Sequence, residues 1–230
     1  MPSKSPYFNR AFFQFLEDLK QNNQREWFQA NKQRYEDEVR HPAQQFISDF
    51  GPELRRISPH FLADPRPSGG SMFRIYRDTR FAKDKSPYKT HVGIQFRHKQ
   101  GKDVHAPGFY LHLEPGGCFA GVGIWHPDAS SLSAIRTAIA EQPARWKRIT
   151  QSKRLTETLE LAGESLKRAP KGYDPDDPMI EDLKRKDFIG VANFDAKTAG
   201  DPDFLTEYWK LCRTGSPLVE FLCEAVDVPF

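Results

Sequence analysis

Basic side chains are concentrated in one short segment of this chain. Six of the sixteen residues from 74 to 89 are Arg or Lys, and only Asp78 and Asp84 carry the opposite charge. A guanidinium group can bind phosphate or carboxylate through two hydrogen bonds, and a lysine ammonium acts as a mobile point charge. This mixture predicts a site for an oxyanion, with phosphate as the natural candidate. The residues expected to contact the ligand are Arg74, Tyr76, Arg77, Arg80, Lys83, Lys85, Tyr88, Lys89 and His91.

The same segment also has a structural interpretation. Lysines on an edge strand deter pairing between sheets, and Asp78 and Asp84 can form ion pairs with neighbouring cations. Whether the cations converge depends on how the chain after Asp78 folds back, so both interpretations stay open.

A second group of polar residues follows the period of a strand. Tyr110, His112 and Glu114 alternate with apolar residues and therefore share one face. If the sheet brings His91 or His126 close, the group becomes an acid–base pair or a metal site, because imidazole and carboxylate together suit several divalent metals. The alternative is the polar outer face of a half-exposed sheet. We predict His112 and Glu114 as catalytic residues, assign no residue as a metal ligand, and leave the cofactor unknown.

His126 lies where a strand is expected to end and a helix to begin. An anion could meet the N-terminal amides of that helix there, so His126 joins the predicted ligand-binding residues. The structural alternative is that His126 packs locally while Asp128 caps the helix.

Several common enzyme classes lack support in the sequence. His112-Leu113-Glu114 is similar to half of the zinc deaminase motif, but the paired cysteines of the other half are missing. The chain also lacks GxxxxGK[ST], GxGxxG, GxSxG and HExxH. Its three cysteines are widely spaced, which favours reduced thiols over disulfides.

Four long motifs resemble one protein family. They are residues 73–91, 110–117, 123–127 and 166–173, and together they extend the resemblance over nearly the whole chain. The family is the domain of unknown function 2461, found in bacteria and some fungi. The resemblance implies no reaction, because the family has no assigned activity or catalytic residues.

The surrounding pattern predicts an α+β fold. Apolar stripes indicate helices from Asn9 to about Gln21, from about Gln24, and after Pro42, before a loop over residues 58–71. Strands are expected at 72–76, 91–98, 109–114 and 118–125, with mainly antiparallel pairing because the connections include a short turn. Helices are expected over about 132–149, 202–212 and from 215 to 226, with a proline-rich loop over 169–178. We expect the N- and C-terminal helical regions to pack on the central sheet.

Length and composition favour one intracellular domain. The 230 residues include 18 Phe, 7 Tyr and 4 Trp, which is enough to fill a single core. No run of about 18 apolar residues occurs and no apolar segment follows Met1, so we predict a cytoplasmic protein with no membrane contact. The net charge of +3 is small for a nucleic-acid-binding protein.

Three functions are compatible with these observations. The first is binding, with possible turnover, of a phosphorylated small molecule or nucleotide at the basic segment. The second is a nucleic-acid-binding module that uses the same cations, and the third is a protein-interaction or structural role without a small-molecule site. A concave pocket that joins the basic segment to His112 would favour the first.

Overall fold

The computed structural model describes residues 6–101 and 106–230. Its centre is a five-stranded antiparallel sheet with the strand order β1-β2-β3-β5-β4. The strands are β1 (Val92–Arg97), β2 (Gly108–Leu113), β3 (Cys118–Ile124), β4 (Glu160–Ala162) and β5 (Phe188–Phe194).

Helices precede, interrupt and follow the sheet in the sequence. Those before it are α1 (Arg10–Gln21), α2 (Arg25–Ala30), α3 (Lys32–Arg34), the π-helix η1 (Tyr35–Arg40) and α4 (His41–Ile57). Those after β3 are α5 (Ala129–Glu141), α6 (Pro143–Thr150), α7 (Lys153–Thr156), α8 (Ile180–Leu183), α9 (Ala196–Ala199) and α10 (Phe204–Ala225). The predicted α+β fold is confirmed.

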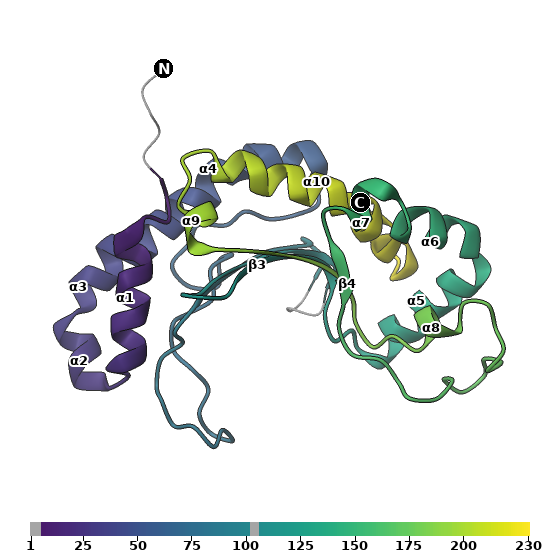
Figure 1. Cartoon of the computed structure of the whole chain (residues 1–230), viewed down its shortest axis with the longest axis horizontal. Coiled ribbons are helices and arrows are strands. Elements are labelled where there is room, and N and C mark those ends of the chain that lie inside the picture. The colour runs from purple at the N-terminus through teal and green to yellow at the C-terminus, as the bar shows by residue number, and fades with distance from the viewer. Residues whose placement is uncertain (1–5, 102–105) are drawn as a thin grey trace.

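The sheet is curved, and the two long helices cover one of its faces. In Figure 1, α4 and α10 run along the upper, convex side, and the shorter helices form a flank at each end of the sheet. The close approach of α10 depends on Gly215, because a Cβ atom there would lie 2.4 Å from Cγ2 of Val122 on β3. The opposite face of the sheet is concave, and no helix of residues 6–101 or 106–230 lies across it (Figure 1).

Alternation of side chains assigns each strand residue to one of these faces. In β2 and β3 the residues that face the long helices are buried, and those on the other face are only partly buried, except for Gly108. Phe109, Leu111 and Leu113 are all 0% exposed and belong to one apolar cluster that also contains residues of α1, α4 and α10. Gly116 makes the turn between these strands with a φ of 82°, a conformation that suits glycine.

The N-terminal helices follow the predicted apolar stripes. The side chain of Asn9 accepts a hydrogen bond from Phe12 N (3.1 Å) and caps α1, whose buried face includes Phe12, Leu16 and Leu19. The helix expected from residue 24 is divided at Asn31, whose amide donates a hydrogen bond to Trp27 O (2.9 Å).

Two expected elements differ from the structure. Residues 72–76 form isolated bridges, Met72 to Ile94 and Tyr76 to Tyr88, and no continuous strand. The two C-terminal helices expected on either side of Gly215 are one helix, α10. Burial of one face of α10 outweighs the weak helix propensity of its internal glycine and proline.

Within the described residues, no helix has the length and apolar character needed to cross a membrane.

Candidate ligand-binding site

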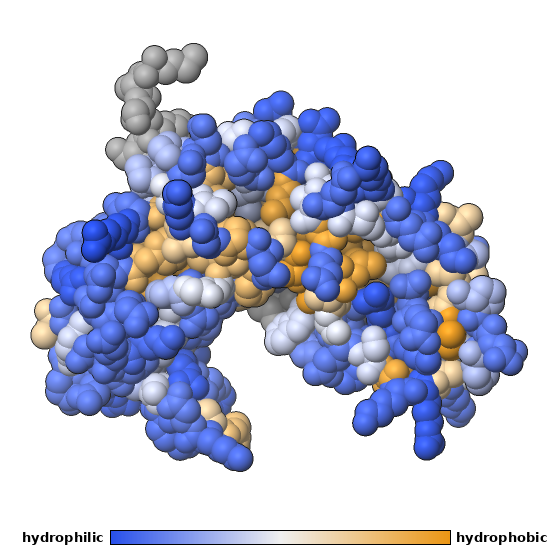
Figure 2. All heavy atoms as spheres, viewed as in Figure 1, coloured by the Kyte–Doolittle hydropathy of each residue, from blue (hydrophilic) through white to orange (hydrophobic). Residues whose placement is uncertain are grey.

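The concave face of the sheet carries a groove. Gly108, Gly121 and Gly123 line a cavity of about 410 Å³ there, and of these three glycines only Gly121 has room for a side chain that would enter it. Figure 2 shows hydrophobic residues gathered along the arch between two hydrophilic flanks. The larger side chains around the cavity belong to Phe73, Tyr110, Phe119, Trp125, Ile189 and Val191.

Among the described residues, the space above Gly121 is open. The nearest atom that an added Cβ would meet is Cβ of Tyr110, at 3.8 Å, so a larger side chain there would enter the groove without a backbone clash. Gly123 differs, because its φ of 123° and a Cβ contact of 2.1 Å with Phe188 O exclude other residues. Gly121 is therefore the suitable position for closing the groove.

A chain of hydrogen bonds lies beside the groove on β2. The hydroxyl of Tyr110 is 3.1 Å from Nδ1 of His112, and Nε2 of His112 is 3.2 Å from Oε2 of Glu114. Because an ionised carboxylate only accepts, Nε2 of a neutral imidazole must donate to Glu114, and Nδ1 then accepts from Tyr110. Burial raises the pKa of Tyr110 to about 12, with a smaller contribution from Glu114, so the phenol keeps its proton at neutral pH.

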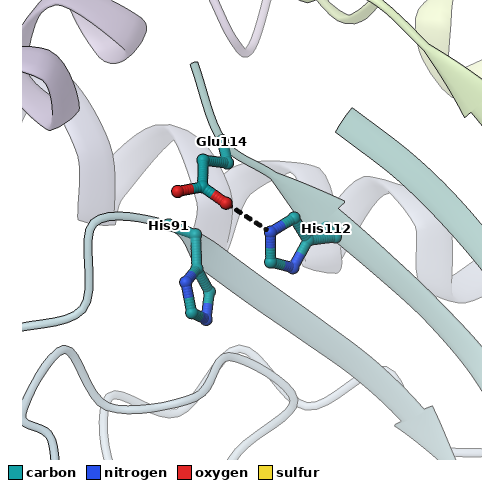
Figure 3. Close-up of side chains that lie close together, drawn as sticks. All are labelled: His91, His112 and Glu114. Atoms are coloured by element: carbon teal, nitrogen blue, oxygen red, sulfur yellow. Dashed lines mark hydrogen bonds and ion pairs between the residues drawn. The ribbon is translucent and has the colours of Figure 1, made fainter. Parts of the chain in front are cut away.

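His91 packs against these hydrogen-bonded residues from the neighbouring part of the sheet. It directly precedes β1, where Val92 pairs with Leu113, so the ladder brings His91 opposite Glu114. The rings of His91 and His112 stack with centroids 4.5 Å apart, and Figure 3 shows both imidazoles and the Glu114 carboxylate around one small space. Burial, followed by the neighbouring imidazole, lowers the pKa of His91 to about 4. Of the two histidines considered from the sequence, His91 is the one found beside His112.

The groove and the polar cluster share two side chains. Tyr110 and Phe119 line the groove, and Phe119 also stacks on His112 with ring centroids 4.6 Å apart at 13°. Gly93 permits this arrangement, since a Cβ there would lie 2.7 Å from the Tyr110 hydroxyl and 2.9 Å from the Phe73 ring.

Part of the basic segment reaches the same region. The ammonium of Lys89 lies over the ring of Phe73, 5.5 Å from its centroid, and donates a hydrogen bond to Arg74 O (2.8 Å). Burial, followed by the charge of Arg74, lowers the pKa of Lys89. The charges of Lys89 and Arg77 also lower the pKa of His91, which indicates that both cations lie near the cluster.

The rest of the basic segment is an exposed loop with internal ion pairs. Arg80 binds Asp78 at 2.6 Å, and Arg77 forms an ion pair with Asp84. Lys85 donates to a backbone carbonyl within the loop, and Lys83 is exposed. This loop extends away from the sheet in Figure 1, so its cations do not all converge.

Comparison with known proteins places the chain in a family. Residues 11–221 match the family described as "Conserved hypothetical protein (DUF2461)", which is nearly the whole chain and agrees with the resemblance seen in the motifs. The chain belongs to the DUF2461 family. Comparison with curated proteins and with solved structures finds no match.

The two tyrosines of this DUF2461 protein that were predicted to bind the ligand have different surroundings. Tyr88 is 2% exposed, and its ring stacks on Phe28 at 4.2 Å, so it lies in the core. Asn23 fixes the Tyr88 backbone by accepting from its N–H (3.1 Å) and donating to its carbonyl (3.0 Å). Tyr76 is half-exposed and packs on Tyr88, and the adjacent Arg74 is exposed.

His126 lies beyond the far end of β3 from the polar cluster. It follows by two residues Ile124, which is about 17 Å from Phe119 at the usual rise per strand residue. Its backbone N–H donates to Oδ1 of Asp187 (2.7 Å), and its Nδ1 lies 3.1 Å from the same oxygen. Asp128 caps α5 by accepting from Ser131 N (2.7 Å), as the structural interpretation expected.

Sequence reasoning missed Asp187 and the part of the groove made by β5. Asp187 is 1% exposed, and its second oxygen accepts from Glu164 N (2.8 Å), so it ties the end of β3 to the segment after β4. The signal for β5 was the apolar run that directly follows Asp187. Its alternation is weaker than that of β2, because Ile189 and Val191, on the face that lines the groove, are apolar as well.

Proposed function

We propose that the groove and the adjoining cations bind a phosphorylated small molecule or nucleotide. The apolar part of this ligand would lie on the glycine-bearing face of the sheet, and its phosphate would lie at Lys89. The observation that carries the proposal is the position of Phe73, whose ring lines the groove and lies beneath the Lys89 ammonium. The apolar groove and the cation that would bind the phosphate are therefore next to each other, on either side of Phe73.

The surroundings of Lys89 support an anion at this place. Lys89 is partly removed from water and lies near Arg74, and both effects disfavour its charged form. A phosphate beside the ammonium would offset the lost hydration and the repulsion between the cations.

The aromatic lining supports a planar group in the groove. Tyr110, Phe119 and Trp125 line it together with aliphatic residues of β5, and a cavity of about 410 Å³ is large enough for a small organic ligand. Such a ligand would contact Tyr110, which hydrogen-bonds to the predicted catalytic residue His112 and through it to Glu114. This contact supports a role for these hydrogen-bonded side chains in ligand binding or in proton transfer.

Thermal unfolding with matched ligands tests the proposal. Nucleoside monophosphates, their nucleosides, ribose 5-phosphate and inorganic phosphate would be added to the wild type and to the Gly121→Leu, Lys89→Met and Lys85→Met variants. A ligand that binds the native state raises Tm. We expect a phosphorylated ligand to raise Tm in the wild type and in Lys85→Met, and to have no effect in the other two variants.

Two results would overturn this function. One is an undiminished Tm shift in Gly121→Leu, since the added side chain occupies the groove. The other is no shift of the wild type with any of these ligands. Circular dichroism of each free variant establishes that it is folded.

Single-stranded nucleic acid is the second candidate because of Phe81. This ring is 95% exposed, and the guanidinium of Arg80 lies 5.9 Å from its centroid. Exposed aromatic rings beside cations can stack on bases. This alternative predicts salt-dependent binding of an oligonucleotide that Phe81→Ala weakens and Gly121→Leu leaves unchanged.

A further inference from the structure

We propose that His91, His112 and Glu114 bind a divalent transition-metal ion beside the groove. Each residue offers one donor atom, and the three donor atoms all lie within 4.8 Å of one another. This site would make His112 and Glu114 ligands of an ion, a role different from the proton transfer predicted from the sequence. It does not depend on the proposed phosphorylated ligand.

The sheet holds the three ligands in place. His112 and Glu114 are two residues apart on and just after β2, and His91 lies opposite Glu114 at the start of β1 (Figure 3). Metal–ligand bonds of about 2.0–2.2 Å would bring the donor atoms closer than they are now. Side-chain rotations would bring the donor atoms together, because the sheet already holds the three residues side by side.

The donor types favour a first-row transition metal. Two imidazoles and one carboxylate are donors of intermediate softness, suited to Zn²⁺, Co²⁺, Fe²⁺ or Mn²⁺. Mg²⁺ and Ca²⁺ prefer sites made of oxygen atoms alone. Three protein ligands also leave coordination positions free, as in catalytic metal sites.

Neighbouring side chains support the ligands as outer-shell residues do in metal sites. The Tyr110 hydroxyl lies 3.1 Å from Nδ1 of His112, which leaves Nε2 for the ion, and the Phe119 ring stacks on the imidazole. The hydroxyl of Thr90 donates to Oε1 of Glu114 at 3.4 Å. A hydrogen bond at the second imidazole nitrogen fixes the ring orientation of metal-binding histidines.

The nearby cations oppose an ion at this place and so provide a test. Lys89 and Arg77 both act on His91 electrostatically, although Asp84 neutralises Arg77 in part. Removing the charge of Lys89 should strengthen metal binding. The same Lys89→Met substitution should weaken phosphate binding, so the two proposals predict opposite effects for one variant.

Calorimetric titration of chelator-treated protein with Co²⁺, Zn²⁺ and Mg²⁺ tests the site. We expect one Co²⁺ or Zn²⁺ ion per chain and no heat from Mg²⁺. The affinity should fall about tenfold or more in His91→Ala and Glu114→Gln. His41→Ala is the matched control, because it also removes an imidazole that lies beside a carboxylate. The His41 side chain is exposed, and its Nδ1 lies 3.7 Å from Oδ1 of Asp37. Equal affinity in the control and the ligand variants would refute the site.

The imidazole tautomer of His112 provides a readout that needs no substitution. Without metal, Nε2–H donates to Glu114, whereas an ion on Nε2 moves the ring proton to Nδ1, which then donates to Tyr110. Nitrogen-15 NMR of the imidazoles, recorded with and without Zn²⁺, should show this exchange. An unchanged His112 tautomer at saturating Zn²⁺ would overturn the proposal. Gly121→Leu should keep the metal response, so loss of the groove ligand alone would leave this inference standing.

Discussion

Replacing Asp187 by alanine should destabilise the protein more than removing an ordinary helix cap. The Asp187 carboxylate is buried and accepts backbone hydrogen bonds from His126 (2.7 Å) and Glu164 (2.8 Å). Alanine would leave both N–H groups without this acceptor at a position that is buried in the native protein.

The size of the effect follows from these two bonds. Leaving a buried donor without a partner costs about 1–3 kcal/mol, and the exposed side chain of His126 allows water to satisfy part of that loss. Alanine also removes the cost of burying a carboxylate. We therefore expect the free energy of unfolding to fall by about 2–4 kcal/mol. Asp187→Asn should lose less, because its amide oxygen retains one of the two bonds.

Urea unfolding at pH 7 measures this difference. Asn9→Ala is the reference variant, since Asn9 accepts one backbone hydrogen bond as the cap of α1 and its loss should cost about 1 kcal/mol. A loss in Asp187→Ala no larger than that in Asn9→Ala would refute the assigned role of Asp187. An m-value equal to that of the wild type would show that both variants unfold to a similar state.

Three further substitutions test other parts of the structure. Gly215→Ala should lower the free energy of unfolding by about 1–3 kcal/mol because its Cβ would overlap Val122, and adding Val122→Ala should restore part of the loss in urea unfolding. Gly93→Ala should displace the Tyr110 hydroxyl and weaken Co²⁺ binding in calorimetry, whereas equal binding would contradict the positioning role of Tyr110. Burial lowers the pKa of His98, so its neutral form stabilises the fold above about pH 6.5 and this contribution is lost as pH falls through the lowered folded-state pKa. The stability of His98→Gln should therefore fall less than that of the wild type between pH 6.5 and 5, and parallel curves would exclude this contribution.

The elements predicted best are those whose apolar pattern has one clear period. The stripe of α1 and the alternation of β2 and β3 each bury one face, so the sequence predicts them directly. Pairing was harder to predict for residues 72–76. Their bridges depend on backbone groups far away in the sequence, such as the Gly93 carbonyl that accepts from Phe73 N (2.9 Å). The helix break predicted near Gly215 was wrong because tertiary burial outweighs local propensity.

The candidate site was predictable to a lesser extent. Alternation alone puts His112 and Glu114 on one face, but the proximity of His91 depends on the register between β1 and β2. That register is set by the whole ladder, including its packing on the helices, and no single residue of the sequence encodes it. The groove was missed because its lining residues come from several strands, whose positions beside one another depend on the pairing of the sheet.

The separation of the two sheet faces has a consequence for how this family can diversify. Gly121 points into the groove, while its neighbours Ala120 and Val122 are buried under the long helices. One codon change at residue 121 could therefore reshape the cavity without repacking the interior. The proposed ligand preference would then change at little thermodynamic cost, with the architecture kept the same.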